Sequence, residues 1–399
     1  MDKGVILKNK GYSSRTLFTT YGKISYKRTL LAPFDKDSAI ALAKIQKPKY
    51  VCPLDDYLGV DGLPFKITVK MMTNIAKECI RASSYERAVD VIKDHYGVTF
   101  STATVRSVTD FVGAVIFKDD QHKADEAEKT LPLSIDRRKK HRNKNDVLYI
   151  EADGAMVNTR RQVEGTSWME CKIGLVFHAK DIHSWKTKTG ATRRQITKKS
   201  LVGYIGSYKI FRYHLLALAR QYNYQYCTQI VFISDGADWI HTIVTELFPD
   251  AIHILDLSHV KEHVGDFGKW INKDADEASK WIEKINKMIE ESQIEEVLKT
   301  LEPYANTKCP DNVLNLYKYI SNHKECMDYK KYKSLGYFVG SGASESANKY
   351  VMQNRMKLQG MRWNKETGQG VLSLKARMES GCWHEVESLL EAYCNRKNN

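Results

Sequence analysis

The chain has 399 residues, more than one ordinary domain, and 42% of them are hydrophobic, which supports sizeable cores and excludes wholesale disorder. Its 62 lysine and arginine residues outnumber 48 acidic ones, which gives a formal net charge of +14. Such an excess favours a polyanionic partner, nucleic acid first and an anionic membrane second, whereas a basic protein with no polyanionic ligand is the plain alternative.

The sequence pattern argues against both membrane insertion and disulfide stabilisation. It holds no run of about 18 apolar residues, the length of a transmembrane helix. The opening stretch MDKGVILKNKGYSS lacks the apolar segment of a signal peptide. The eight cysteines form no C-x-x-C pair, which argues against a zinc finger and against a dense disulfide framework. We therefore expect a cytoplasmic protein with reduced thiols and no membrane partner.

A β-hairpin is expected first along the chain. Residues 15–32, RTLFTTYGKISYKRTLLA, alternate apolar and polar side chains on either side of Tyr21 and Gly22. This alternation around a turn is typical of a hairpin, and we assign residues 1–48 to an N-terminal hairpin region.

Helices follow in residues 49–130, which we assign to a helical DNA-binding domain. One helix begins near Ser84 and stops at Gly97, and a second begins at Ser101 and Thr102, whose hydroxyls can cap unpaired N–H groups. Two short helices joined by a glycine-containing turn form a helix-turn-helix candidate, although any helical hairpin fits the same pattern. The second helix would direct outward the side chains of Thr102, Thr104 and Arg106.

A basic stretch separates these helices from the strands that follow. DRRKKHRNKND, residues 136–146, carries six lysine or arginine side chains. A solvated linker explains it, and we assign residues 131–146 to such a linker, although the run also suits contact with phosphates.

Strands are expected between residues 147 and 259. Three candidates come in succession and two more alternate with helices, an order that predicts an α/β fold with a mixed five-stranded sheet flanked by helices. The candidates are residues 147–157, 167–181, 193–206, 229–233 and 251–255.

Two of these strands are expected to end in an aspartate. Asp153 would end the first strand and Asp235 the fourth, and glycine follows each of them. Adjacent strands lie only about 4.8 Å apart, so the two carboxylates would face one crevice if their strands are neighbours. Divalent cations would relieve their repulsion, and oxygen ligands favour Mg²⁺ or Mn²⁺. Two such ions about 3.5–4 Å apart can assist the cleavage of a phosphodiester.

Other side chains could complete or support this site. Glu345, in GSGASESANKYVMQNRMK, falls in the first turn of a helix and would be a third acid, although the helix dipole alone also explains a glutamate there. Asp256 and His259 could support the site or form a buried structural pair. A basic face beyond Glu345 could contact DNA or simply be solvated; it comprises Lys349, Arg355, Lys357, Arg362 and the stacking candidate Trp363.

Several segments resemble transposases. SDGADWI followed by LFPDAIHILDLSH resembles the second-aspartate region of Mutator-type transposases. YIEADGAMV and SWMECKIGLVF resemble the first catalytic strand and its partner in bacterial insertion-sequence transposases, and GSGASESANKYVMQNRMKLQGMRW resembles their glutamate-bearing helix. The resemblance extends from about residue 15 to residue 383 and points to the ISLre and ISKra groups.

This resemblance implies a ribonuclease H-like core over residues 147–259 and 336–399, with an all-helical insertion over residues 260–335. It also implies a DDE triad, in which each acid serves as a catalytic residue and a metal ligand. The triad would consist of Asp153, Asp235 and Glu345.

The resemblance further implies an activity, namely cleavage at the ends of an insertion element and strand transfer into target DNA, with two Mg²⁺ (or Mn²⁺) ions per site. The N-terminal helices would read terminal inverted repeats, and the protein would act on paired ends as a homo-oligomer in the bacterial nucleoid. Two alternatives share these features: a transposase-derived DNA-binding protein without catalysis, and a nuclease without strand transfer.

Overall fold

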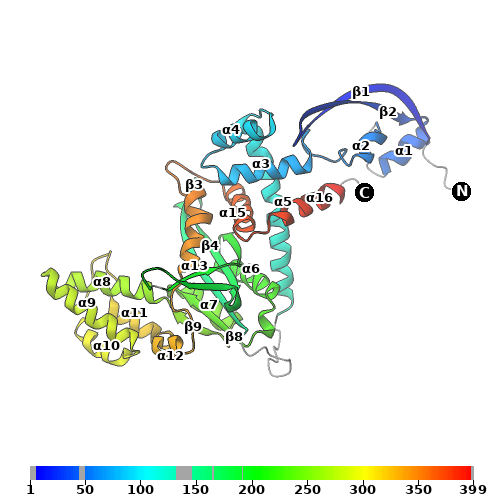
Figure 1. Ribbon diagram of the computed structural model, residues 1–399. Coiled ribbons are helices and arrows are strands. Elements are labelled where there is room, and N and C mark those ends of the chain that lie inside the picture. Colours follow the sequence, from blue (N-terminus) through cyan, green and yellow to red (C-terminus); the bar gives the residue numbers. More distant parts are fainter. Residues whose placement is uncertain (1–5, 45–49, 132–145, 164–165, 191, 397–399) are drawn as a thin grey trace. The chain divides into compact units, whose positions relative to one another are not determined.

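The structure is a computed structural model that describes residues 6–44, 50–131, 146–163, 166–190 and 192–396 (Figure 1). The chain divides into two compact units, one of residues 1–119 with 366–399 and the other of residues 120–365. The expected linker over residues 131–146 lies, apart from its first and last residues, outside the described residues.

The first unit begins with the hairpin that the sequence predicts, and this hairpin is longer than expected. Strands β1 (Leu7–Thr19) and β2 (Gly22–Pro33) pair antiparallel. The turn between them leads into Gly22, whose φ of +100° suits a residue without a Cβ. A register irregularity between Asn9 and Tyr12 interrupts the ladder near its open end.

Helices make up the rest of the described part of this unit. They are α1 (Lys36–Lys44), α2 (Pro53–Tyr57), α3 (Val69–Arg81), α4 (Tyr85–Tyr96), α5 (Thr102–Lys129), α15 (Lys365–Glu379) and α16 (Trp383–Arg396). α5 passes into the second unit after Asp119. A Cβ added to Gly113 of α5 would lie 2.8 Å from the backbone of Gly370, so α5 and α15 pack closely. Residues 366–399, which the sequence groups with the catalytic core, thus lie in the first unit.

α4 has both of its predicted ends and α5 begins where the sequence predicts, but α5 is longer than predicted. Ser84 Oγ accepts the N–H of Arg87 at 3.3 Å, and Gly97 ends α4 with a left-handed φ of +63°. Ser101 Oγ accepts the N–H of Thr104 at 3.1 Å at the start of α5. α5 has 28 residues instead of being short, because buried apolar side chains recur along its length.

A buried aspartate joins α2 to the hairpin. The carboxylate of Asp55 is fully buried and accepts hydrogen bonds from Arg15, Tyr26 and Arg28. The Arg15 and Tyr26 contacts are each 2.6 Å long. Burial of a charge is tolerated where partners of this kind replace water, so this cluster fixes α2 on the two strands.

Replacing Asp55 with alanine is expected to destabilise the hairpin region by about 3–5 kcal/mol, because its partners would lose their shared buried acceptor. Hydrogen–deuterium exchange at the amides of β1 and β2 should accelerate accordingly. Asp56→Ala, at the exposed neighbouring position, is the matched control and should leave this exchange unchanged. Equal exchange in the two variants would contradict the role of Asp55.

The second unit is built on a mixed five-stranded sheet, as the sequence predicts. The order across the sheet is β7-β4-β3-β8-β9, in which β4 is antiparallel to both of its neighbours and the β3–β8 and β8–β9 pairs are parallel. This confirms the α/β class with a mixed sheet (Figure 1). The strands are β3 (Val147–Val163), β4 (Thr166–His178), β7 (Ser200–Ile205), β8 (Gln229–Ser234) and β9 (Ile252–Leu255).

Two strand boundaries differ from the prediction. β3 does not end at Asp153 but continues well beyond it, because β4 still pairs with it there, with Asp153 opposite Ile173. The third candidate, residues 193–206, contains two separate strands because a polar Thr-Lys-Lys run interrupts its pattern. β6 (Thr192–Ile196) forms a separate hairpin with β5 (Ile182–Lys186), and only β7 joins the main sheet.

Helices cover both faces of this sheet. α6 (Tyr208–Gln221) packs on one face, where a Cβ added to Gly174 of β4 would lie 2.6 Å from an α6 side chain. α13 (Gly342–Asn348) packs where the N–H of Ser344 donates to Glu151 of β3 at 2.7 Å. Glu151 pairs with the residue after Gly174, and successive strand residues point to opposite faces. α6 and α13 therefore lie on opposite faces.

α7 (Asp238–Leu247) connects β8 to β9, and residues 257–334 then form helices without a strand. After α13 the helix continues through a π-helical turn, η5 (Lys349–Gln353), into α14 (Asn354–Met356). Within the part of the chain that the structure describes, no helix combines the length and apolarity needed to cross a membrane. The helices of residues 257–334 are α8 (Leu257–Ile271), α9 (Ala275–Glu290), α10 (Ile294–Leu301), α11 (Leu316–His323) and α12 (Tyr329–Ser334).

Candidate functional site

Asp153 of β3 and Asp235, which directly follows the neighbouring strand β8, lie at the same level of the sheet. The parallel pairing of β3 with β8 ends at Glu151 opposite Ile233, and each aspartate follows two residues later. Burial raises the pKa of Asp153, and the negative charge of Asp235 raises it further. The two carboxylates are therefore close enough to repel each other.

The carboxylate of Asp153 is held from two sides. Its Oδ1 accepts the N–H of Gly154 at 2.6 Å, and its Oδ2 accepts the side-chain amide of Asn348 at 2.6 Å. These hydrogen bonds and the nearby His259 act to lower the pKa of Asp153, but the effect of burial is larger and the net shift is upward. Asn348 belongs to α13, so a helix from a distant part of the chain orients a β3 side chain.

A tight turn after β8 positions Asp235. Its Oδ1 accepts the N–H of Ala237 at 3.0 Å, and Gly236 adopts a φ of +92°, which residues with a Cβ rarely adopt. Two side chains of α11 hold the backbone of this turn. The hydroxyl of Tyr319 donates to the carbonyl of Asp235 at 3.0 Å, and His323 Nε2 lies 2.9 Å from the carbonyl of Gly236.

Asp256 is engaged in structural hydrogen bonds. Its buried Oδ1 accepts the N–H of Ser258 at 2.6 Å and so caps α8. Its Oδ2 accepts the N–H of Ser341 at 3.0 Å and also the hydroxyl of that serine. His259 Nε2 is 3.9 Å from the same oxygen. This geometry favours the structural alternative for Asp256, which ties the start of α8 to the start of α13.

Glu345 occupies the expected first turn of α13, and its side chain is exposed. It lies one residue after Ser344 and three before Asn348, the two residues that hydrogen-bond to β3. Side chains three positions apart share a helix face, so Glu345 projects from the same side as Asn348. The ligand oxygens of Asp153, Asp235 and Glu345 are not all within 4.8 Å of one another.

The three acids lack a lysine or arginine partner among the described residues. Asp153 and Asp235 repel each other, and carboxylates without a lysine or arginine partner form a donor set that suits a divalent cation with a preference for oxygen. The residues present are therefore compatible with Mg²⁺ or Mn²⁺.

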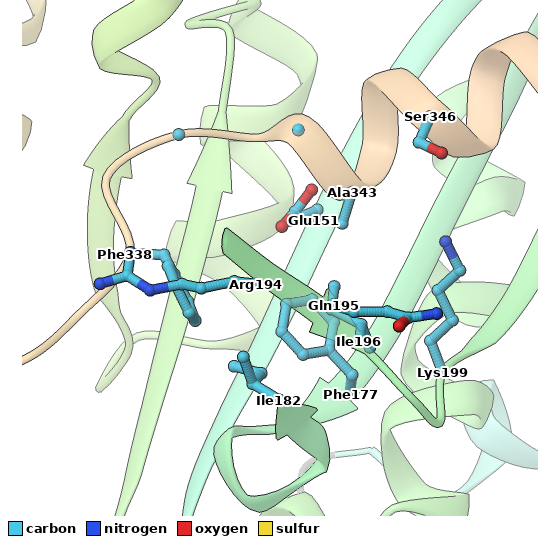
Figure 2. A pocket seen from close by; sticks show the side chains of 12 residues that line it. Glu151, Phe177, Ile182, Arg194, Gln195, Ile196, Lys199, Phe338, Ala343 and Ser346 are labelled. Carbon is cyan, nitrogen blue, oxygen red and sulfur yellow. The ribbon is translucent and has the colours of Figure 1, made fainter. Parts of the chain in front are cut away.

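A further buried acid, Glu151, lines a pocket of about 550 Å³ beside α13 (Figure 2). Burial raises the pKa of Glu151 to about 8, although hydrogen bonds from Ser344 act to lower it. Basic side chains line the same pocket. The guanidinium of Arg194 lies 4.8 Å from the ring centre of Phe338, and Lys199 points toward α13 (Figure 2). The sequence alone assigns Glu151 no role, because its burial depends on the packing of α13.

Glu151→Gln should flatten the pH dependence of stability. Folding raises the pKa of Glu151 from 4.5 to about 8, so its contribution is fully present below pH 4.5 and is lost as the pH rises to about 8. The loss is at most about 1.4 kcal/mol per pH unit. Glutamine keeps an acceptor for Ser344 but cannot ionise. As the pH rises from 4.5 to about 8 in chelator-containing buffer, the Tm of the Glu151→Gln variant should therefore fall less than the Tm of the wild type. Equal slopes of Tm against pH for the two proteins would contradict this role of Glu151.

The expected DNA-contacting face is only partly exposed. The exposed members are Lys349, Lys357 and Arg362. Arg355 is buried, and its guanidinium lies 5.1 Å from the ring centre of Trp363. Trp363 is buried too, and its Nε1–H donates to a backbone carbonyl at 3.0 Å. Arg355 and Trp363 therefore pack inside the unit and do not form part of an exposed stacking surface.

The expected contact residues of α5 are half-buried rather than fully outward. The hydroxyl of Thr104 lies 2.8 Å from that of Ser101, and Thr102 is likewise half-buried. Arg106 Nε is 3.7 Å from Asp110, and 38% of the Arg106 side chain is exposed. Of the three expected residues, Arg106 is the one that can offer a charge to an external partner.

A different group of potential metal ligands lies at the other end of the β3–β8 ladder. The ligand atoms of Asp146, His178 and Cys227 all lie within 4.8 Å of one another. The sequence does not reveal this group, because its members are 32 (178 − 146) and 49 (227 − 178) positions apart and match no metal-binding motif.

The fold and the site define an α/β protein with a mixed sheet and a pair of aspartates at one end of its parallel ladder. The chain belongs to the uncharacterised protein family UPF0236, whose model matches residues 5–390. Comparison with curated proteins gives no match. Among solved structures, the chain is similar to the Drosophila P element transposase strand transfer complex, with 9% identity over 88% of this chain and 87% of that chain and a TM-score of 0.25. At that TM-score the similarity carries no functional argument.

Proposed function

We propose that this protein is a DDE-type DNA transposase with Asp153, Asp235 and Glu345 as its triad. In this proposal residues 147–259, together with residues 336–365 of the same unit, form a ribonuclease H-like core. The observation that carries the proposal is the matched level of Asp153 and Asp235 at one end of a parallel ladder, where each charge opposes the other. The resemblance of the acid-bearing segments to insertion-sequence transposases supports the same assignment.

The donor set fits Mg²⁺, with Mn²⁺ as a substitute. All three acids offer only oxygen ligands, and none has a lysine or arginine partner in the described part of the chain. Asp153 and Asp235 would hold two ions between them, and Glu345 would complete the ligands of one. When bound, such ions activate an attacking oxygen and offset charge on the scissile phosphate.

The remaining contribution of the protein is positioning. Asn348 orients the carboxylate of Asp153, and α11 holds the turn that carries Asp235. Glu345 is exposed on the same helix as Asn348, and in this proposal its carboxylate would turn toward the two aspartates. Pre-organised backbone around the acids limits the rearrangement needed when DNA is bound.

The DNA partners follow from charge and exposure. The net charge of +14 favours a polyanion, and Lys349, Lys357 and Arg362 are exposed beyond Glu345, where they would contact DNA phosphates. Helices α4 and α5 would read the terminal inverted repeats. A homo-oligomer would hold two element ends near one target DNA.

Alanine at Asp153, Asp235 or Glu345 should reduce cleavage of labelled element ends to background, because each change removes a metal-binding carboxylate. Binding of the same ends in a gel-shift assay should persist. Asp238→Ala, which removes an exposed acid in the first turn of α7, is the matched control and should cleave normally. Retained cleavage by any triad variant would remove that residue from the triad.

The same assay, with Mg²⁺ and a target plasmid, separates the proposed activity from its alternatives. DNA joined to the plasmid supports transposition. Cut ends without joined product favour a nuclease that lacks strand transfer. Bound but uncut DNA favours a transposase-derived DNA-binding protein.

Arg106→Ala should weaken binding to the inverted repeats and reduce the slope of log affinity against log salt by about one, as expected for loss of one phosphate contact. Lys118→Ala is the matched control, since Lys118 is an exposed cation twelve residues (118 − 106) further along α5. Identical salt slopes for the Arg106 variant and the wild type would show that Arg106 makes no phosphate contact.

A further inference from the structure

Three strand termini meet at the end of the β3–β8 ladder opposite the aspartates. Asp146 directly precedes β3, His178 is the last residue of β4, and Cys227 lies two residues before β8. Hydrogen bonding fixes the backbone there. The carbonyl of Asp146 accepts the N–H of Thr228 at 2.9 Å, and His178 pairs with Leu148 across the antiparallel ladder. The three side chains therefore project from fixed positions.

The ligand atoms of this group are already close to the spacing of a metal site. His178 Nδ1 is 2.8 Å from Asp146 Oδ1, and Cys227 Sγ is 3.9 Å from Asp146 Oδ2. In tetrahedral zinc sites, bond lengths of about 2.0–2.3 Å place neighbouring ligand atoms roughly 3.4–3.6 Å apart. The three ligand atoms lie within 4.8 Å of one another, so side-chain adjustment without movement of the strands would bring the group to that spacing.

We propose that Asp146, His178 and Cys227 bind one Zn²⁺ ion, with a water molecule as the fourth ligand. A thiolate, an imidazole and a carboxylate together suit zinc, whereas Mg²⁺ and Mn²⁺ prefer oxygen ligands. On binding, the thiol of Cys227 gives its proton to solvent and a zinc–sulfur bond forms. This assignment is independent of the proposed transposase activity.

Neighbouring groups orient the ligands. Cys227 is buried, and its sulfur lies 3.7 Å from the carbonyl of Asn223. The ring of His178 lies against the ring of Tyr222, with centroids 5.5 Å apart. A zinc ion held here would link the start of β3, the end of β4 and the segment that leads into β8. β3 and β8 are the strands that carry or precede Asp153 and Asp235 at the other end of the ladder.

Cobalt substitution tests the site in the full-length protein, purified without a metal-affinity tag and stripped with a chelator. One equivalent of Co²⁺ should produce the sulfur-to-cobalt charge-transfer absorption of a thiolate ligand, and Zn²⁺ should displace it. Co²⁺ bound by the three acids would give no such band, because those ligands contain no sulfur. Cys227→Ser should abolish the band. Asp146→Asn should weaken binding by more than the roughly 10–100-fold loss that outer-shell changes cause.

Cys309→Ser, which alters a partly exposed thiol outside the group, is the matched control and should retain the band. Circular dichroism of each variant checks that it is folded. Absence of the band in the wild-type protein would overturn the proposal and leave a hydrogen-bonded cluster only. Equal bands in Cys227→Ser and Cys309→Ser would overturn it as well.

Discussion

The parallel pairing of β3 with β8 is the constraint on which the candidate site depends. β8 is short and its pairing ends at Glu151 opposite Ile233, whereas β3 continues against β4. Asp153 therefore sits on a strand that is still hydrogen-bonded on one side, and Asp235 sits on the turn that follows β8. The two acids lie at the same level because each follows the last β3–β8 pair by two residues, and the charge of Asp235 acts on Asp153 at that level.

α13 supplies the second half of this arrangement. It contacts Glu151 through Ser344 and Asp153 through Asn348, across sequence separations of 193 and 195 positions. Glu151 and Asp153 face the same helix because residues two apart on a strand point the same way. Hydrogen bonds from Ser344 and Asn348 thus stabilise these two carboxyl groups, and the nearby Lys199 and His259 also act to lower their pKa values.

Helix caps and strand ends could be predicted from the sequence alone. α4 begins after Ser84 and ends before Gly97 as predicted, and Asp235 does follow a buried strand, because caps and strand ends depend on nearby residues. The length of β3 beyond Asp153 depends on pairing with β4, and the burial of Arg355 depends on its packing against an aromatic ring. Both are contacts between segments, which periodicity does not report. The triad itself stays a prediction.

The same limit applies to the cluster of a thiol, an imidazole and a carboxylate at the far end of the ladder. Its members are brought together only when three strands take their places in the sheet. A search for closely spaced cysteines and histidines cannot find such a group. The sheet thus brings chemically distinct polar groups to its two ends, hard oxygen donors at one and mixed donors at the other.

The hydrogen bonding of α11 has a consequence for how this chain could be shortened. Tyr319 donates to the carbonyl of Asp235, and His323 lies beside the carbonyl of Gly236, so the turn after β8 relies on side chains that come from residues 257–334. Deleting that helical segment would remove the side chains that contact the carbonyl oxygens of Asp235 and Gly236, and the turn that carries Asp235 would become less rigid. A minimal version of the sheet, however well folded, would have lost the scaffold of one of its two aspartates.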